Sequence, residues 1–322
     1  MRTIIFCCLS SLILISCGTG QVGMSDLTGR YYPEEYKVWT PLKIHSENND
    51  IAVDLYSRSF AQGDVVYVEV MPAGDNSIRK VSLTSCERKI PMTEKAWGYR
   101  GFIAVNPAKD PCENNIVVNY TCGGAKELPV SFAVRDANFK VVKKALDLGS
   151  FSDSTNPISP ELQAFIEECT KLKRKAFTEK IPDCITASLS HPRDKHYITS
   201  EFFSQRVYMR YRYENGKRVH LKDTNKIHYG VDLRGPLGSP VFAITSGKIT
   251  LSALLHYEGN MIVVNHGDGI YSYYMHMSKR IAQEGTFVRG GQKIGEVGST
   301  GVSTGPHLHV ALVVHGVDAD PL

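Results

Sequence analysis

Three short histidine-containing segments in the last third of the chain constrain its fold most, because they lie far apart in sequence yet suit one common site. They read His-Tyr-Gly-Val-Asp at residues 228–232, Tyr-Met-His at residues 274–276 and Gly-Pro-His-Leu-His at residues 305–309. Together they supply four histidines and one aspartate. We therefore expect a fold in which three distant segments meet at a single site.

The local sequence indicates how these segments present their side chains. His307 and His309 lie two residues apart before a strand-like run, residues 310–314, and alternate residues of a strand face the same side. Gly230, in the middle of the first segment, favours a bent strand or loop and allows another backbone to approach closely. His307 and His309 should therefore face one site together.

The residue types in these segments are those that bind zinc. Imidazole nitrogens and carboxylate oxygens are common zinc ligands, and a catalytic zinc takes three of them and leaves a fourth position for water. His228, Asp232 and His309 would form such a set. His276 and His307 would then remain for proton transfer.

The sequence around these residues resembles the LytM/lysostaphin-type zinc metallopeptidases, peptidase family M23. The resemblance rests on residues 259–267, 271–278 and 298–309, and it covers about residues 198–322. It implies a peptidase domain that binds one Zn²⁺. The ligands that it implies are His228, Asp232 and His309, and the catalytic histidines are His276 and His307.

The activity that the resemblance implies is hydrolysis of the peptide cross-links of bacterial peptidoglycan, in stem peptides or in glycine bridges. Zinc lowers the pKa of a bound water to about 7 and polarises the scissile carbonyl. Because the chain contains no His-Glu-x-x-His motif, His276 and His307 are the candidates for taking the water's proton or stabilising the oxyanion. The sequence does not assign these two roles or choose the bond.

Two departures from the family pattern and two alternative functions stand beside this interpretation. Val310 and Ala311 replace the Phe-Glu that often follows in relatives, and residues 203–206 read Phe-Ser-Gln-Arg instead of Phe-Gly-x-Arg. The main alternative is an inactive LytM-like regulator that activates another wall hydrolase. A third is a lipoprotein whose β domain binds a protein partner. Inactive LytM-like domains characteristically lack zinc ligands, so the complete set favours the enzyme.

Length and charge add little about partners. The chain of 322 residues exceeds the usual size of one domain. A net charge of +4 suits an anionic wall polymer but is common in proteins without such a partner. The basic run at residues 171–175 is typical of a solvated helix face, since no nucleic-acid-binding module surrounds it. We expect no nucleic-acid partner.

Residues 1–17 are typical of a secretion signal. Arg2 precedes an apolar stretch, residues 4–15, that is shorter than the roughly 20 residues of a transmembrane helix. Leu-Ile-Ser-Cys at residues 14–17 resembles the bacterial lipobox, in which Cys17 would be lipidated; an ordinary cleaved signal is the alternative. We predict an exported protein, anchored by its lipid to a bacterial membrane facing the periplasm or cell wall, with residues 18–40 as a tether.

The sequence predicts a mainly β protein. Short strands between turns at residues 41–136 indicate an immunoglobulin-like β-sandwich that acts as a spacer, a wall- or partner-binding module, a cap over the active site, or a passive scaffold. Residues 137–197 are expected to be a linker with a helix at 160–177, capped by Ser159 and started by Pro160. Residues 198–322 are expected to form an antiparallel-β peptidase domain, with a hairpin turn at Asn215-Gly216.

The cysteines predict disulfide bonds, because an oxidising compartment favours them. Five follow Cys17, so that one thiol is left over: Cys86, Cys112, Cys122, Cys169 and Cys184. We expect one bridge among the first three, with Cys112 to Cys122 favoured, and one between Cys169 and Cys184.

Overall fold

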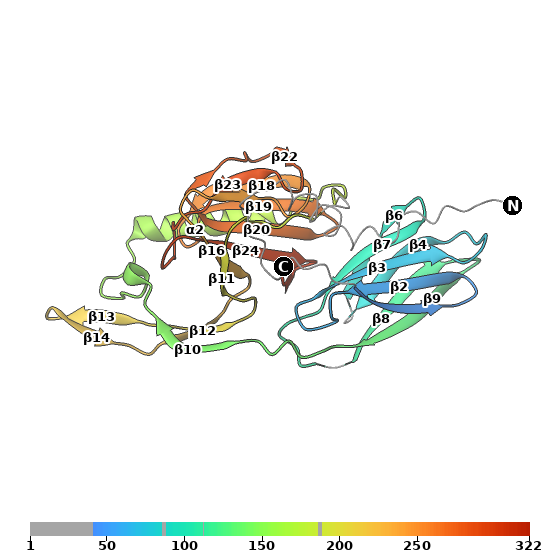
Figure 1. Ribbon diagram of the computed structural model, residues 1–322, viewed down its shortest axis with the longest axis horizontal. Helices are drawn as coiled ribbons and strands as arrows, with labels where there is room; N and C mark the ends of the chain where they lie inside the picture. The colour runs from blue at the N-terminus through green and yellow to red at the C-terminus, as the bar shows by residue number, and fades with distance from the viewer. Residues whose placement is uncertain (1–40, 86–87, 112, 186–188) are drawn as a thin grey trace.

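The computed structural model describes residues 41–85, 88–111, 113–185 and 189–322 (Figure 1). The predicted signal, lipidation site Cys17 and tether lie outside these residues, as do Cys86 and Cys112. Strands dominate the described part, which confirms the predicted mainly β class. No helix within the described ranges is long and apolar enough to cross a membrane.

The first nine strands form two sheets that pack face to face, with orders β1-β2-β3-β7-β6 and β5-β4-β8-β9. Without β1, these orders match strands A-B-E-D and C′-C-F-G of the immunoglobulin fold. The predicted sandwich is therefore present. Its strands are β1 (Leu42–Glu47), β2 (Ile51–Ser57), β3 (Val65–Pro72), β4 (Arg79–Ser85), β5 (Arg88–Pro91), β6 (Thr93–Lys95), β7 (Gly98–Ala104), β8 (Glu113–Thr121) and β9 (Ala125–Ala133).

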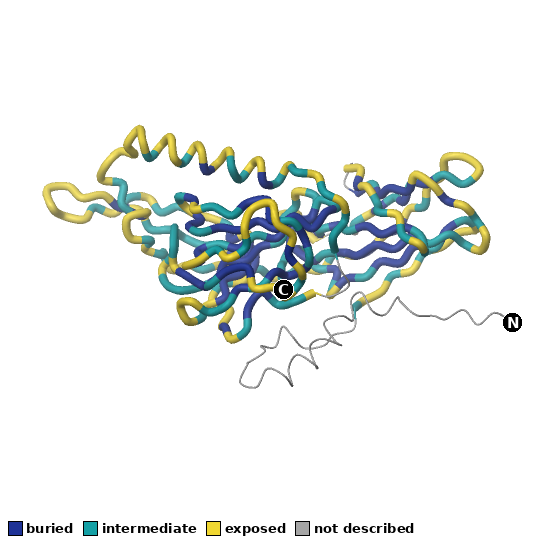
Figure 2. Tube along the Cα trace, turned by 90° about the horizontal axis from the view of Figure 1, so that it is seen from above, coloured by how far each residue is buried: buried dark blue, intermediate teal, exposed yellow. Residues whose placement is uncertain are grey.

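Alternating apolar residues explain why the two sheets pack. Val66, Val68 and Val70 of β3 and Ile116 and Val118 of β8 are fully buried in one core between the sheets. Fully burying one such side chain contributes roughly 1.5 to 3 kcal/mol. The sandwich thus has a hydrophobic core of its own, seen on the right of Figure 2.

The C-terminal part is built on an eight-stranded sheet. Seven of its strands follow the order β11-β16-β24-β20-β19-β18-β22, and the eighth, β25, pairs with β24. Beside it lies the three-stranded sheet β17-β23-β21. The strands are β11 (Tyr197–Ser200), β16 (Val231–Arg234), β17 (Pro240–Phe242), β18 (Gly247–Leu255), β19 (Gly259–Gly267), β20 (Ile270–Met277), β21 (Lys279–Arg280), β22 (Phe287–Val288), β23 (Lys293–Glu296), β24 (His307–Val314) and β25 (Val317–Ala319).

Alternate residues of the eight-stranded sheet sort onto two faces. Ile262 and Val264 of β19 join a core with β17 and β23, whereas Met261 and Val263 face the helix α2 (Pro160–Ala176). This helix begins as predicted: the Ser159 hydroxyl accepts the backbone N–H of Leu162 at 3.2 Å. Figure 2 shows α2 lying along the sheet with its outer side exposed.

The predicted Cys169–Cys184 disulfide is wrong, because both thiols are free. Cys169 points from α2 into the apolar cluster on the sheet. Cys184 lies in a loop, and its backbone N–H donates to the His266 carbonyl at 2.8 Å. Cys122 is also free, so it has no bridge to Cys112.

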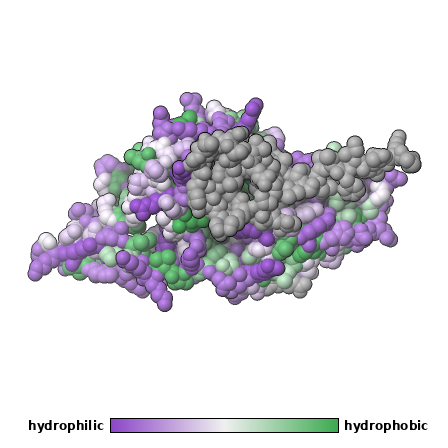
Figure 3. All heavy atoms as spheres, in the orientation of Figure 1, coloured by the Kyte–Doolittle hydropathy of each residue, from purple (hydrophilic) through white to green (hydrophobic). Residues whose placement is uncertain are grey.

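Residues 137–197 do more than connect the two parts. β10 (Val141–Leu146) pairs in parallel with β12 (Gln205–Tyr208), which pairs with β15 (Thr224–Ile227). A hairpin of β13 (Tyr211–Glu214) and β14 (Lys217–His220) projects from this small sheet, with hydrophilic side chains along it (Figures 1 and 3). Its turn is the predicted Asn215-Gly216, and both residues have positive φ, as a type I′ turn requires. The short 3₁₀ helix η2 (Gly149–Phe151) follows β10.

A charge cluster around the buried Arg100 joins the sandwich to the C-terminal part. Arg100 of β7 is 3% exposed and forms an ion pair with Asp183. The Lys95 ammonium also contacts Asp183, at 2.6 Å, and the Thr93 hydroxyl donates to Asp268 at 2.6 Å. We call Lys95, Arg100, Asp183 and Asp268 the interface cluster.

Candidate metal centre

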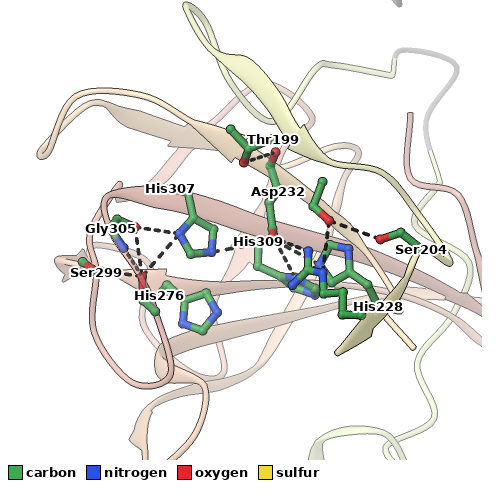
Figure 4. A network of polar contacts seen from close by, with 12 residues as sticks. Thr199, Ser204, His228, Asp232, His276, Ser299, Gly305, His307 and His309 are labelled. Atoms are coloured by element: carbon green, nitrogen blue, oxygen red, sulfur yellow. Dashed lines mark hydrogen bonds and ion pairs between the residues drawn. The ribbon is translucent and has the colours of Figure 1, made fainter. Parts of the chain in front are cut away.

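The register of the eight-stranded sheet brings the predicted site residues together (Figure 4). Asp232 on β16 lies directly opposite His309 on β24, and His309 lies opposite Met275 on β20, one residue before His276. His228 enters from the bend after β15, and His307 is the first residue of β24. All five predicted side chains therefore meet at one end of the sheet.

Three of these side chains converge within a single ion's reach. His228 Nε2 lies 2.9 Å from His309 Nδ1 and 3.0 Å from Asp232 Oδ1, and His309 Nδ1 lies 3.0 Å from Asp232 Oδ1. All three residues are buried. One ion at the usual zinc bond length of roughly 2.0 to 2.2 Å can reach all three atoms. The donor set, two imidazoles and a carboxylate, thus fits zinc.

Contacts behind these atoms fix their orientation. His228 Nδ1 donates to the Glu201 carbonyl at 3.0 Å, so that Nε2 presents its lone pair to the cluster. Arg206 donates to Asp232 Oδ2 at 2.6 Å, which leaves Oδ1 facing the histidines. Partners of this kind hold metal ligands in place and raise metal affinity.

The protonation states also suit a cation. Burial alone would raise the pKa of Asp232, but its close polar contacts with His228 and His309 outweigh burial and hold this pKa well below its usual range. Burial lowers the pKa of His309 to about 4. At neutral pH the site therefore offers an anionic carboxylate and a neutral imidazole, the forms that bind metal.

His276 and His307 lie side by side next to these three residues, with ring centroids 4.8 Å apart (Figure 4). His276 Nδ1 donates to the Thr300 carbonyl at 2.9 Å, and His307 Nδ1 donates to the Gly305 carbonyl at 2.7 Å. Each ring thus keeps Nε2 as its proton-accepting atom. Burial, together with the neighbouring histidines, lowers the pKa of His276 to about 3, so this imidazole is neutral at pH 7.

Two turns hold His276 in a strained backbone conformation. Its φ is 62°, in the region that residues other than glycine rarely occupy. Its N–H donates to the Glu258 carbonyl at 3.0 Å, and the Thr300 hydroxyl accepts the N–H of Asn260 at 2.9 Å. A Cβ on Gly259 would lie 2.3 Å from Thr300, so the turns fit only with glycine there. Such strain is typical of functional sites.

Gly230 leaves room for a metal ligand. A Cβ at this position would lie 2.6 Å from His309 Nε2 and 2.5 Å from the Val310 carbonyl oxygen. Its φ is not in the left-handed region, so space and not conformation requires glycine here.

The five side chains line a cleft of about 300 Å³. Leu146 and Leu148, from β10 and the residues after it, form part of its wall with Tyr208 of β12. Of the residues that the structure describes, none from β1 to β9 lines this cleft. The sandwich instead packs near Val314, at the opposite end of β24 from His307. Its described residues therefore do not cover the cleft, and of the alternatives for this domain the cap is the one that they do not support.

The sequence did not reveal the support of Asp232 by Arg206. Ser204, which we noted as a departure from the family pattern, belongs to this support: its hydroxyl lies 3.2 Å from the Ser200 hydroxyl, which accepts from Arg206 Nε at 3.1 Å. The role of Leu146 was equally hidden. The alternation of Arg206 and Tyr208 along β12 was a signal for a shared face, but nothing local indicated which site that face lines.

Comparison with known proteins agrees with this geometry. Residues 226–321 match the model of peptidase family M23. The chain is 40% identical over 117 residues to DD-carboxypeptidase/endopeptidase Mpg of Neisseria meningitidis, and 32% identical over 136 residues to peptidoglycan DD-endopeptidase ShyC of Vibrio cholerae. These matches cover 36% and 42% of this chain but only 27% and 29% of the relatives.

A solved structure resembles a larger part of the chain in fold. The crystal structure of a putative M23 peptidase from Pseudomonas aeruginosa superimposes with a TM-score of 0.55, over 81% of this chain and 92% of that one, at 20% identity. The family match, the similar sequences and the position of the histidines on the sheet agree with one another. The chain therefore carries a domain of peptidase family M23, the LytM/lysostaphin family.

Proposed function

We propose that this protein is a zinc-dependent endopeptidase that hydrolyses peptide cross-links of bacterial peptidoglycan. The observation that carries the proposal is the convergence of His228 Nε2, Asp232 Oδ1 and His309 Nδ1 within 3.0 Å of one another at the base of a cleft. His228, Asp232 and His309 would hold the ion. When bound, zinc supplies a water of lowered pKa and a Lewis acid for the scissile carbonyl.

The two remaining histidines would handle the proton. Neutral His276 Nε2 can accept a proton from the attacking water at pH 7, and the imidazolium can return it to the leaving amine. His307 Nε2, which lies 3.8 Å from Asp232 Oδ1, is a second proton-accepting atom beside the ligands, so either ring could take this proton. The hydrogen bonds from both Nδ1 atoms fix the rings for these roles.

The substrate class is supported by the relatives. The relatives from Vibrio cholerae and Neisseria meningitidis are named as a peptidoglycan DD-endopeptidase and a DD-carboxypeptidase/endopeptidase. The wall of the cleft combines apolar Leu146 and Leu148 with Tyr208. A cross-linking peptide would lie between this wall and the two histidines.

We further propose that the protein is exported and anchored to a membrane through a lipid on Cys17. The support is the sequence pattern alone: Arg2, the apolar stretch at residues 4–15 and Leu-Ile-Ser-Cys at residues 14–17. Labelling of expressing cells with a radioactive fatty acid tests it. Label that persists in Cys17→Ala would contradict the anchor.

Digestion of purified peptidoglycan tests the proposed activity. The purified chain, with its zinc content measured, is incubated with sacculi, with and without a chelator, and the muropeptides are identified by mass spectrometry. We expect cross-linked muropeptides to disappear without chelator and to persist with it. In His309→Ala they should persist even without chelator. Folded, zinc-loaded protein that releases nothing would overturn the proposal.

A further inference from the structure

Four aromatic rings form a surface beside the cleft, and we call Phe151, Phe165, His256 and Tyr257 the aromatic platform. The His256 ring lies 4.5 Å from the Tyr257 ring, 5.4 Å from the Phe151 ring and 6.3 Å from the Phe165 ring, between centroids. Phe151, Phe165 and Tyr257 are 37%, 43% and 44% exposed. A contiguous patch of exposed apolar side chains is typical of a binding site, whereas single exposed apolar residues are not.

The platform exists because α2 extends past the part of the sheet that it covers. Phe165 and Cys169 are four residues apart and lie on the same face of the helix. Cys169 is 4% exposed on the sheet, whereas Phe165 remains exposed next to His256. The apolar face of α2 therefore continues past Cys169 to Phe165, which lies beside the His256 ring and remains exposed.

The platform is continuous with the cleft through Tyr257, which belongs to both. A peptide bound in the cleft would therefore have its covalently attached neighbour next to these rings. In peptidoglycan that neighbour is a sugar. The C–H groups on one face of a pyranose ring are weakly positive and stack on the electron-rich face of an aromatic ring. The Tyr257 hydroxyl and the His256 imidazole can in addition bond to sugar hydroxyls.

We propose that the aromatic platform binds the glycan strand of peptidoglycan while the attached peptide occupies the cleft. This inference rests on the proposed function. It gives the segment from β10 to α2, outside the matched family domain, a role in substrate recognition.

The test compares two substrates that share one cross-link. One is the disaccharide-linked muropeptide dimer, and the other is the same peptide dimer after an amidase has removed the sugars. Phe165→Ala and Phe151→Ala in the full chain should lower kcat/KM on the sugar-linked dimer by about fivefold to tenfold each, and leave kcat/KM on the sugar-free dimer unchanged. Alanine is a good helix former, so Phe165→Ala keeps α2 intact. Phe287→Ala is the matched control, because Phe287 is 62% exposed on β22 and should affect neither substrate.

A second measurement separates this inference from the proposed function. Peptide-free glycan strands are titrated into the full chain by calorimetry, which needs no turnover, and Phe165→Ala should weaken binding by the same roughly fivefold to tenfold. Equal losses on both dimers, no loss on either, or an unchanged glycan affinity in Phe165→Ala would each overturn the platform. If the wild type cuts neither dimer but binds glycan through Phe165, the proposed activity fails and the platform stands.

Discussion

Two clusters in this molecule each contain an aspartate paired with cationic or titratable neighbours, and they do different things. Asp232 faces His228 and His309, whereas Asp183 of the interface cluster faces Lys95 and Arg100. Burial opposes ionisation of both carboxyls, yet the pKa of each is lowered, because in both cases close polar contacts with the carboxylate outweigh burial.

The difference lies in the neighbours. Neutral imidazoles keep a lone pair for a metal, whereas lysine and arginine carry only donors at neutral pH. The first cluster also opens into a cleft, whereas the second lies at the contact between two packed parts of the chain. Burial and a low carboxyl pKa therefore do not identify a functional site; the type of partner and its access do.

The largest effect expected is loss of the metal. Asp232→Ala or His228→Ala should reduce zinc from one ion per chain to none, and activity to the chelator-treated background, because two remaining ligands do not hold zinc. Elemental analysis and muropeptide release measure the two quantities. Full zinc content in Asp232→Ala would remove this residue from the ligand set.

His276→Ala should separate metal binding from turnover. The His276 ring packs beside the His307 ring, but His276 is not one of the three residues whose ligand atoms converge. We expect unchanged zinc content and a decrease in kcat of roughly 10² to 10⁴, the usual contribution of a general acid or base. His220→Ala, at an exposed histidine of β14, is the control and should keep full activity. A decrease in zinc content in His276→Ala would instead make it a ligand.

The interface cluster should respond in stability and not in metal content. Arg100→Met leaves Asp183 and Asp268 without their buried partner, and breaking a buried ion pair costs about 3 to 5 kcal/mol. Guanidinium unfolding measures the change, with zinc bound per folded chain expected to be constant. Arg88→Ala is the control, since this arginine is exposed and donates to the uncharged carbonyl of His315. A change of less than about 1 kcal/mol in Arg100→Met would contradict the structural role.

Arg206 supports the proposed metal site although it is itself a permanent cation. Arg206→Met keeps the length of the side chain but frees Asp232 Oδ2, and zinc affinity should decrease about 10-fold to 100-fold. Competition with a fluorescent chelator gives the affinity, and Arg206→Lys should recover part of it. Unaltered affinity in Arg206→Met would show that Asp232 needs no second partner.

Acid should affect the two clusters in different pH ranges. Because the pKa of buried His309 falls from 6.5 to about 4 on folding, the unfolded chain binds more protons between these values, so the metal-free protein loses stability as pH falls from about 6.5 to about 4. The pKa of Asp183 is lowered from 3.8, so its contribution is lost only below that pH. Urea unfolding of metal-free protein at several pH values measures both. A flat profile above pH 4, equal to that of His309→Gln, would contradict the first range.

The residues of the site could be predicted from the sequence because each of the three distant segments carries a short motif of specific chemistry, and the motifs together resemble one family. The sandwich and α2 could be predicted because alternating apolar residues and a Ser-Pro start act over a few positions. The pairing of β10 with β12 could not, since residues 141–146 contain nothing that selects a partner strand. The disulfide prediction failed for a related reason: counting cysteines does not show that Cys169 is buried on the sheet while Cys184 lies in a loop beside β19.

Gly230 has a consequence for how such domains change over evolutionary time. Any side chain there would collide with the ring of His309, a residue 79 positions later in the chain, and also with the backbone carbonyl of Val310 on the same strand. In a descendant that had lost His309, the Val310 carbonyl would still exclude a side chain at position 230. A retained glycine at this position is therefore a record of how closely β24 passes, and it would outlast the histidine that the strand carries.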